Sequence, residues 1–400
     1  MTDESSLGPR QMNRLRIIEA LYRRPMSSRA DLARETALSR ATVSTLVEEL
    51  VQAGLVEENA GAPGGSGPGG EAGVGRPPAL VSLVSGAAFA VGLDFGHQHI
   101  RVALCDLSGE PIVDDYSPAQ VDHAPMESLD LAQELVGEAL RRAGVSSDQL
   151  LGVGMGLAVP IVKATRELAA DGILPGWHGV RPAEEMEARL GVPVALDNDA
   201  NVGALGEKAF GAARGVDDLI YVRLSAGIGA GLILEGHPYA GVTGLAGEIG
   251  HVLSDPSGPI CRCGNRGCLE AVASPVAVAG LLERSIGERV TVPRLLELVA
   301  EGHRGARRAV AEAGEAVGRA VSTAVNILNP ELVVVGGDLA QAGEPLLAPI
   351  SAAIERHSVA PAAGAVRVTA GTLGARAEVL GAAALILAKS PRALVARLGA

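Results

Sequence analysis

The chain has few aromatic residues and few cysteines. Aromatic side chains make up 2% of its 400 residues, so its hydrophobic content of 48% comes mainly from Val, Leu, Ala and Ile. A core of such residues suits helices packed on parallel sheets. Four cysteines are too few for a disulfide framework in a chain of this size. The length predicts two or three domains, because a single core rarely serves so long a chain.

The chain also lacks a long apolar run. No run reaches the roughly 18 residues that span a bilayer. The N-terminal segment MTDESSLGPR does not have the basic and then apolar pattern of a signal peptide. These absences argue against a membrane partner and lead us to expect a cytoplasmic protein.

The charge is unevenly distributed along the chain. The formal net charge of −12 argues against non-specific binding of nucleic acid by the whole molecule. Between Arg10 and Val47, however, eight arginines stand against three acidic residues, a local charge of +5. A basic head on an acidic body is typical of a small DNA-binding domain joined to a larger one.

Three helices are predicted in this head. Apolar residues at helical spacing mark a first helix over residues 11–24. Ser28 and Asp31 form a capping-box-like start for a short second helix, and Ser39 caps a third helix that continues to Gly54. A short helix, a tight turn and a longer helix predict a helix-turn-helix.

The start of the third helix is expected to contact base edges in the major groove. An arginine there suits a bidentate contact with guanine, which we predict for Arg40. The predicted base-contacting residues are Ser39, Arg40, Thr42 and Ser44. A three-helix bundle that binds other proteins is the alternative interpretation, but the arginine excess and the helix caps favour DNA.

A glycine-rich stretch follows the three helices. The segment GAPGGSGPGGEAGVGRPP lies between LVEE and the strand-like ALVSLV. This pattern indicates a winged helix with a long wing tip, from which Arg76 reaches a minor groove or a phosphate. A flexible linker between domains is the alternative. In either case the winged helix-turn-helix domain is predicted to occupy residues 1–84.

Strands alternate with helices in the remaining residues, 85–400, which predicts an α/β body. Glycine turns follow or join predicted strands in FAVGLDFGHQHIRVALC, RLSAGIGAGLILEG and ELVVVGGDLAQAG. Three such turns that face one cleft can hold a nucleotide or a sugar. Singly each is weak evidence, since glycine clusters mostly mark hairpins. The residues considered for nucleotide binding are Asp94, Gly96, Gly227, Gly229, Gly336 and Gly337.

Five further motifs occur in the order GLAVP, LDNDANVGALGE, SAGIGAGLILEG, GLAGEIGH and CRCGNRGCLE. Together with the head, they make the chain resemble the ROK family of repressors, open reading frames and sugar kinases, in its branch with an N-terminal winged helix-turn-helix. The resemblance implies a two-lobed body of the actin-like ATPase fold. The first lobe is expected over about residues 85–200 plus a C-terminal helix, and the second over about 201–378.

The resemblance and the spacing together predict a zinc site. Cys261, Cys263 and Cys268 supply three thiolates, and His251, ten residues before the first of them, supplies a nitrogen. Because protein fills all four positions, such a zinc ion is structural, and it would fix the loop that carries Glu270. Reduced thiols without metal, or one disulfide with a leftover cysteine, are the alternatives.

The resemblance also implies a sugar site. The family binds sugars through the Asn and Asp of NDAN, the Glu and His of GEIGH and the Glu of CLE. The matching residues here are Asn198, Asp199, Glu248, His251 and Glu270, and Gly172 is expected to line the same cleft. In the kinases of the family, the residue that matches Asp199 acts as a general base. For DNDAN alone, an Asx-rich turn that caps a helix is the alternative.

The phosphate turns depart from the kinase pattern of the family. Asp-x-Gly-Gly-Thr becomes Asp94-Phe95-Gly96-His97-Gln98, and Gly-Thr-Gly-x-Gly becomes Ser225-Ala226-Gly227-Ile228-Gly229. Crowding at these turns hinders ATP binding more than sugar binding.

We therefore expect a sugar-responsive DNA-binding transcriptional regulator, a repressor of carbohydrate metabolism that binds operator DNA and a sugar or sugar derivative. A homodimer or homotetramer is expected, because one helix-turn-helix contacts only a half-site. The alternative is a hexose kinase with an attached head, which uses ATP and magnesium with Asp199 as its base. A protein that acts only through partner proteins is a third possibility.

Overall fold

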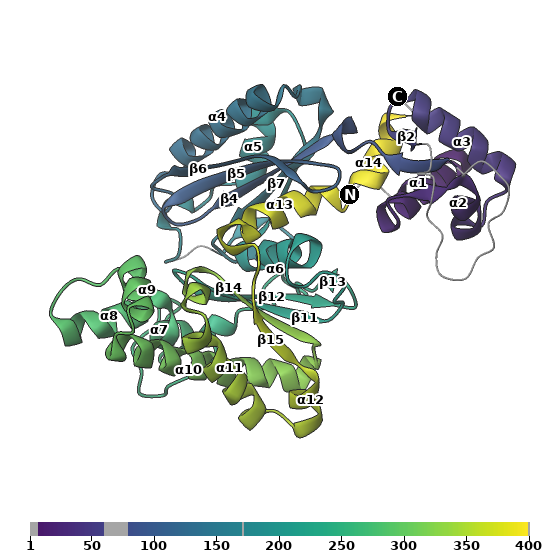
Figure 1. Ribbon diagram of the computed structural model, residues 1–400. Helices are drawn as coiled ribbons and strands as arrows, with labels where there is room; N and C mark the ends of the chain where they lie inside the picture. The colour runs from purple at the N-terminus through teal and green to yellow at the C-terminus, as the bar shows by residue number, and fades with distance from the viewer. Residues whose placement is uncertain (1–6, 60–78, 170–171, 399–400) are drawn as a thin grey trace.

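The computed structural model describes residues 7–59, 79–169 and 172–398 of the chain. It has an N-terminal head, followed by a body with two five-stranded sheets (Figure 1). The predicted α/β class is therefore confirmed.

The head contains three helices and a small antiparallel sheet in the strand order β1-β3-β2. Its elements are α1 (Pro9–Arg23), β1 (Ser27–Ser28), α2 (Arg29–Thr36), α3 (Arg40–Gln52), β2 (Val56–Asn59) and β3 (Leu80–Leu83). The Ser28 hydroxyl caps α2 by accepting from the Asp31 amide at 3.1 Å. The Ser39 hydroxyl caps α3 in the same way. The helix-turn-helix and the two strands that flank the wing are thus confirmed, whereas Arg76 and the wing tip lie outside the described residues.

The first sheet of the body has the strand order β10-β7-β4-β5-β6. Its strands are β4 (Phe89–Phe95), β5 (His99–Asp106), β6 (Pro111–Pro118), β7 (Leu150–Leu157) and β10 (Val194–Asn198). The strands β4, β7 and β10 are parallel, whereas β5 and β6 run antiparallel to their neighbours. Asp94, which the motif predicts at a turn, is a buried residue of β4.

The second sheet has the strand order β13-β12-β11-β14-β15. Its strands are β11 (Leu219–Leu224), β12 (Ile228–Leu234), β13 (His237–Pro238), β14 (Leu332–Gly336) and β15 (Arg367–Ala370). After β14 the chain enters a 3-10 helix, η5 (Asp338–Ala342). The α-helix α11 begins only at Glu344.

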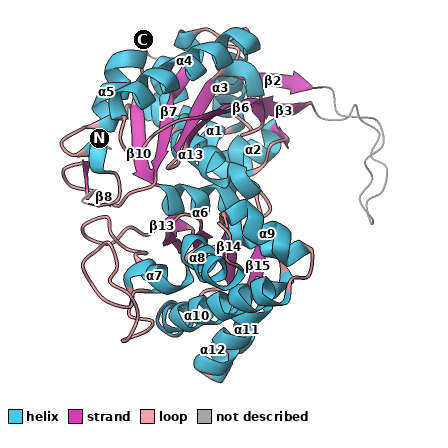
Figure 2. Ribbon diagram, turned by 90° about the vertical axis from the view of Figure 1, so that its left-hand side faces the viewer, coloured by secondary structure: helices cyan, strands magenta, loops and turns pink. Residues whose placement is uncertain are grey.

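Helices cover the outer faces of both sheets (Figure 2). Beside the first sheet lie α4 (Pro125–Ala143) and α5 (Pro182–Leu190). Six helices share a hydrophobic core with the second sheet: α7 (Leu269–Ala273), α8 (Pro275–Ile286), α9 (Val292–Ala300), α10 (Arg304–Leu328), α11 (Glu344–His357) and α12 (Ala360–Ala365). The short elements are η1 (Ser85–Ala87), η2 (Ser147–Gln149), β8 (Ile161–Val162), β9 (Glu167–Leu168), η3 (Pro175–Trp177), η4 (Ile249–His251) and η6 (Gly374–Arg376).

Two helices lie between the sheets. The helix α13 (Ala377–Leu387) packs on β4 and β7, and α6 (Asp199–Phe210) packs between α13 and the second sheet (Figure 1). The last helix, α14 (Ser390–Arg397), packs against α1 of the head. The C-terminal residues therefore return to the first sheet as expected, and they also join it to the head.

Among the described residues, no single helix has the length and hydropathy needed to cross a bilayer. One bent pair, Gly374–Leu387 with Ser390–Arg397 at 44°, meets these criteria by length and composition when its two parts are taken together.

Candidate functional site

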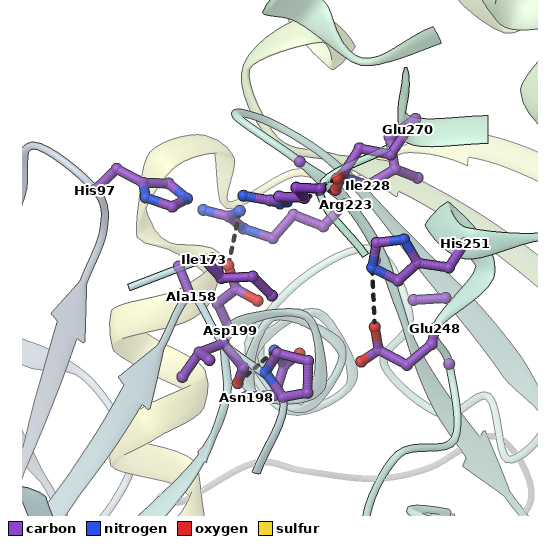
Figure 3. Close-up of a pocket in the computed structure, with 17 residues that line it drawn as sticks. His97, Ala158, Ile173, Asn198, Asp199, Arg223, Ile228, Glu248, His251 and Glu270 are labelled. Carbon is purple, nitrogen blue, oxygen red and sulfur yellow. Dashed lines mark hydrogen bonds and ion pairs between the residues drawn. The ribbon is translucent and has the colours of Figure 1, made fainter. Parts of the chain in front are cut away.

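A small polar cavity lies where the ends of β7 and β10 face β12 and η4 (Figure 3). Its volume is about 50 Å³. Its lining includes five of the six residues predicted to bind sugar: Asn198, Asp199, Glu248, His251 and Glu270. The sixth, Gly172, does not line the cavity, but its neighbour Ile173 does. Gly172 has a φ of +77°, and this left-handed backbone accounts for a glycine there.

The junction of β10 and α6 supplies two of the lining side chains. The Asn198 Oδ1 accepts from the Ala200 amide at 2.9 Å and so caps α6, while its Nδ2 donates to the Val159 carbonyl at 3.1 Å. The Asp199 Oδ1 also accepts from the Ala200 amide, at 2.8 Å. The motif is thus an Asx cap, the alternative interpretation, and the same cap fixes both side chains at the cavity.

Arg223 of β11 joins the cavity to α13. Its Nη1 lies 2.8 Å from the Asp199 Oδ2, and its Nε donates to the Glu378 Oε1 at 2.8 Å. The Tyr221 hydroxyl donates to the same Glu378 oxygen at 3.3 Å. Burial alone would lower the pKa of Arg223, but the nearby carboxylates, Asp199 above all, raise it. Arg223 is therefore cationic, and its charge is divided between two buried carboxylates.

A second guanidinium is paired with Glu270. The Arg262 Nε and Nη2 donate to the two Glu270 carboxylate oxygens at 2.8 and 2.9 Å, a bidentate pair. Glu270 Oε2 also accepts from the Ile228 amide at 3.1 Å. A Cβ on Gly227 would lie 2.5 Å from that oxygen, so a glycine is needed beside Glu270.

Among the described residues, Glu248 forms no ion pair with an arginine or a lysine. Its Oε2 lies 3.8 Å from the His251 Nε2. Burial, together with the charges of Asp199 and Glu270, raises the pKa of Glu248 to about 7. The cavity therefore presents carboxylates, an amide and an imidazole, which are side chains that exchange hydrogen bonds with vicinal hydroxyls.

A wider cavity of about 210 Å³ adjoins the first. It shares five lining residues with the polar cavity: Pro160, Ile173, Glu248, His251 and Arg262. Ala169, Leu245 and Cys263 complete its lining.

Of the six residues considered for nucleotide binding, only Gly227 and Gly229 line the polar cavity. At the first turn, a Cβ on Gly96 would lie 2.2 Å from His99, so the imidazole occupies the adjacent space. His99 Nε2 donates to the Asp94 Oδ2 at 3.0 Å.

Tyr221 and a backbone carbonyl account for the glycines after β14. A Cβ on Gly336 would lie 2.1 Å from the Tyr221 hydroxyl, and one on Gly337 would lie 2.5 Å from the Leu224 carbonyl oxygen. Of the three glycine turns, the second lines the polar cavity with its glycines and the first with His97, whereas Gly336 and Gly337 do not line it.

His97 of the first turn does line the cavity. Its Nδ1 lies 2.8 Å from the Asp122 Oδ1, which holds the ring in place. An imidazole thus stands where a kinase of the resembled family has a glycine.

The four predicted metal ligands are brought together. One ligand atom from each of His251, Cys261, Cys263 and Cys268 lies within 4.8 Å of the others. The Cys261 Sγ is 3.6 Å from the His251 Nδ1, and the Cys263 Sγ is 3.6 Å from the Cys268 Sγ. A tetrahedral zinc ion with bonds of about 2.3 Å to sulfur requires sulfur separations of about 3.8 Å. The donor set therefore fits one metal ion, and the thiols are free.

The charge of the head is more balanced than the count over Arg10–Val47 predicts. Five of the eight arginines form ion pairs: Arg10 and Arg14 with Glu49, Arg23 with Glu35, Arg29 with Glu48 and Glu58, and Arg34 with Asp31. Glu48 and Glu49 lie just beyond the counted window, so the excess of +5 overstates the free positive charge.

At the start of α3, Arg40 is exposed and has no ion-pair partner among the described residues. Ser39 and Thr42 form the helix cap, with their hydroxyls 2.8 Å apart. Ser44 is half-buried, and its carbonyl accepts from Arg29 at 3.4 Å. Arg40 is thus the most available of the predicted DNA contacts in the described part of the head.

Two residues that line the cavity, Arg223 and Arg262, are not among those that the motifs predict. A signal was present for the first, because LIYVRL places one cation in an otherwise apolar strand. Arg262 lies between Cys261 and Cys263 in the cysteine motif, whose spacing predicts metal ligands and gives no role to the residue between them. Glu378 was not predicted at all, because only the tertiary fold brings it to Arg223.

Comparison with known proteins gives two family matches. Residues 90–389 match the ROK family, and residues 9–64 match the MarR family. The xylose repressor of Caldicellulosiruptor bescii is 30% identical over 362 residues, which cover 87% of this chain and 88% of that protein.

Two solved structures are also similar. One is a ROK family transcriptional regulator homologous to the Mlc protein of Escherichia coli. Its TM-score is 0.80 at 24% identity, over 97% of this chain and 98% of that chain. The other is the ROK family glucokinase of Streptomyces griseus in complex with glucose and AMPPNP. Its TM-score is 0.67 at 26% identity, over 74% of this chain and 99% of that chain.

Proposed function

Because this chain belongs to the ROK family, we propose that it is a sugar-responsive DNA-binding transcriptional regulator, a repressor of carbohydrate metabolism. The full-length similarity to a xylose repressor supports this function. The observation that carries the proposal is the combination, in one chain, of a helix-turn-helix head and a hydroxyl-binding cavity whose phosphate turn is filled by imidazoles.

The sugar site consists of Asn198, Asp199, Glu248, His251 and Glu270, which converge on the polar cavity. Carboxylate and amide oxygens accept hydrogen bonds from ring hydroxyls, and the amide and imidazole nitrogens donate to them. The cavity of about 50 Å³ is smaller than a typical ligand site of 300 Å³ or more. The adjoining cavity of about 210 Å³ shares part of its lining, and a sugar would occupy space in both.

The metal site would hold zinc through the His251 Nδ1 and the sulfurs of Cys261, Cys263 and Cys268. When bound, zinc supplies a fixed tetrahedral crosslink, and with four protein ligands it activates no water. The ligand set leaves the His251 Nε2 directed toward Glu248 and the cavity (Figure 3). The residues of this segment would thereby be held at the sugar site.

A sugar kinase is the second candidate, favoured by Asp199 in the cavity and by the similarity to a glucokinase. A general base needs a carboxylate that is free to accept a proton from the substrate hydroxyl. Here Asp199 is paired with Arg223, and His99 fills the space beside Gly96. These contacts oppose both proton transfer and phosphate binding, and they favour the regulator over the kinase, which would need ATP and magnesium.

The head would bind operator DNA through the start of α3, with Arg40 at a guanine and Ser39, Thr42 and Ser44 beside it. A pair of heads is required to read a two-fold symmetric operator, which supports a homodimer or homotetramer.

The test begins with a duplex that the purified chain selects from random-sequence DNA. Its dissociation constant is then measured with and without D-xylose and D-glucose, and ATP consumption is followed with the same sugars. We expect a sugar-dependent change in DNA binding and no turnover. A chain that selects no DNA sequence, or that consumes ATP with either sugar, would contradict the proposal.

The DNA contact is tested by Arg40→Ala. Loss of a bidentate guanine contact costs about 1–3 kcal/mol of binding free energy. Arg23→Ala is the matched control, because the Arg23 guanidinium is already committed to Glu35. Equal effects of the two variants on the selected duplex would remove Arg40 from the interface.

A further inference from the structure

The structure contains a continuous connection between the polar cavity and the head. It begins with Arg223, whose guanidinium contacts Asp199 in the cavity and Glu378 in the first turn of α13. Its side chain is 12% exposed, and those of Asp199 and Glu378 are 11% and 6% exposed. Because water screens these charges little, a ligand group that alters the contact between Arg223 and Asp199 also alters the electrostatic attraction between Arg223 and Glu378.

The next part of the connection is α13, which is held by backbone contacts on two sides. On the sheet side, a Cβ on Gly92 would lie 1.9 Å from the Val379 carbonyl oxygen, and one on Gly154 would lie 1.7 Å from that of Ala382. On the α6 side, a Cβ on Gly381 would lie 1.6 Å from a carbonyl oxygen of α6. With no side chains between these backbones, α13 cannot tilt by repacking rotamers, and it transmits a displacement along its length.

The last part is the contact of α14 with the head. Only Ala388 and Lys389 separate α13 from α14. The Tyr22 hydroxyl of α1 lies 2.6 Å from the Ser390 hydroxyl, which itself donates to the Leu387 carbonyl at the end of α13. Since the serine proton is used there, Tyr22 is the donor to Ser390.

Apolar packing reinforces this hydrogen bond. Leu394 and Val395 of α14 are fully buried and belong to one hydrophobic cluster with Ile18 and Leu21 of α1. The core of the head is thus continuous with the C-terminal helix of the body. Figure 1 shows α13 leading from the region between the sheets to α14, which lies against α1.

We propose that Arg223, Glu378 and the α13–α14 pair form a relay that transmits sugar binding at Asp199 to the orientation of the DNA-binding head. The relay deepens the proposed function and rests on it. A sugar hydroxyl that binds Asp199 competes with Arg223, the Arg223 to Glu378 contact changes, and α13 carries the change to Tyr22. Arg223 and Glu378 act here as positioning residues.

The relay is tested by a coupling factor, the ratio of the dissociation constants for the selected duplex without and with saturating sugar. The sugar is whichever of D-xylose and D-glucose changes binding by the unaltered chain. Allosteric coupling commonly amounts to about 5- to 150-fold. Glu378→Gln keeps the size of the side chain and removes its charge, and Tyr22→Phe removes the hydrogen bond at the other end. We expect both variants to bind sugar and DNA, with coupling factors that fall toward 1.

Asp114→Asn is the matched control. Asp114 forms a bidentate pair with Arg101 on β6 and β5, at 2.7 and 3.0 Å, and among the described residues neither forms a hydrogen bond or ion pair with Arg223, Glu378 or Tyr22. Its coupling factor should stay within about twofold of that of the unaltered chain. If Asp114→Asn lowers coupling as much as Glu378→Gln does, the effect is not specific and the relay is refuted.

The remaining outcomes separate the relay from the proposed function. Wild-type coupling that persists in both relay variants overturns the relay alone. If Glu378→Gln does not fold, the test rests on Tyr22→Phe. A coupling factor near 1 in that variant supports the relay, and an unchanged coupling factor overturns it. An unaltered chain that shows no coupling with either sugar overturns the proposed function, and the relay falls with it.

Discussion

Replacement of Arg223 by methionine should destabilise the protein strongly and in a pH-dependent manner. Methionine keeps the unbranched apolar stem and removes the guanidinium, so Asp199 and Glu378 lose their shared partner. Removing one partner of a buried ion pair costs about 3–5 kcal/mol, because the remaining charge stays buried and uncompensated. We expect the Arg223→Met variant to lose a free energy of unfolding in that range at pH 8.

The pH dependence follows from the carboxylate left behind. Burial raises the pKa of Glu378, and Arg223 opposes that rise, so removal of the guanidinium raises this pKa further. A carboxyl group whose pKa is higher in the folded state than in the unfolded state binds more protons when folded. Relative to the unaltered chain, the variant should therefore lose the least stability at low pH and more as the pH rises from about 4.5 through the folded-state pKa of Glu378.

The measurement is urea unfolding followed by circular dichroism at pH 5 and pH 8. The double variant Arg223→Met/Glu378→Gln should recover part of the loss at pH 8, because one uncompensated charge is then gone. Arg101→Met is the matched control: its pair with Asp114 is about 20% exposed, so the remaining carboxylate stays hydrated and this variant should lose less stability than Arg223→Met.

Two results would refute this account of Arg223. One is a decrease of less than about 1 kcal/mol in the free energy of unfolding at pH 8, which is the contribution of an exposed ion pair. The other is an equal loss at pH 5 and pH 8, which would mean that no carboxylate near Arg223 changes its protonation.

Two further predictions concern the metal and the packing of α13. Cys263→Ser should lower bound zinc from one ion per chain, measured by elemental analysis, and weaken sugar binding, whereas Cys105→Ala, in the core of β5, should retain the metal. Full zinc occupancy in Cys263→Ser would exclude that sulfur as a ligand. Gly154→Ala should cost about 3 kcal/mol or more in thermal unfolding, because its Cβ would lie 1.7 Å from the Ala382 carbonyl oxygen. Gly280→Ala, in a helix with open space around it, should be neutral or stabilising by up to about 1 kcal/mol, and similar losses in both variants would count against the packing argument.

Local signals in the sequence predicted the head well. The caps at Ser28 and Ser39 are interactions between residues three positions apart, so the segment itself contains both partners. The strands on either side of the wing were likewise marked by their own composition. The free charge of the head was predicted less well, because ion pairs such as Arg14 with Glu49 join different helices.

The metal ligands were predicted from one short segment together with the family resemblance, whereas the sugar residues lie in three separate motifs and were predicted from the resemblance alone. His251 and the three cysteines span a short segment, and a loop of that length brings its own ligands together. The glycine turns were a weaker guide. Gly336 is required because the Tyr221 side chain leaves no room for a Cβ there, not because a ligand approaches it. The sequence shows that a position is a glycine, but not which neighbour excludes a larger residue.

The sequence by itself determined the fold class, the helix caps of the head and the residues that gather at the cavity and the metal site. The tertiary structure alone decided what those residues contact. Arg223 and Glu378 are 155 residues apart, and their pairing depends on β11 and α13 meeting beside the cavity. Helix periodicity and motif spacing reflect interactions between residues that are close in the sequence. A buried charge, by contrast, is neutralised by a partner from a distant segment, which only the tertiary fold brings near.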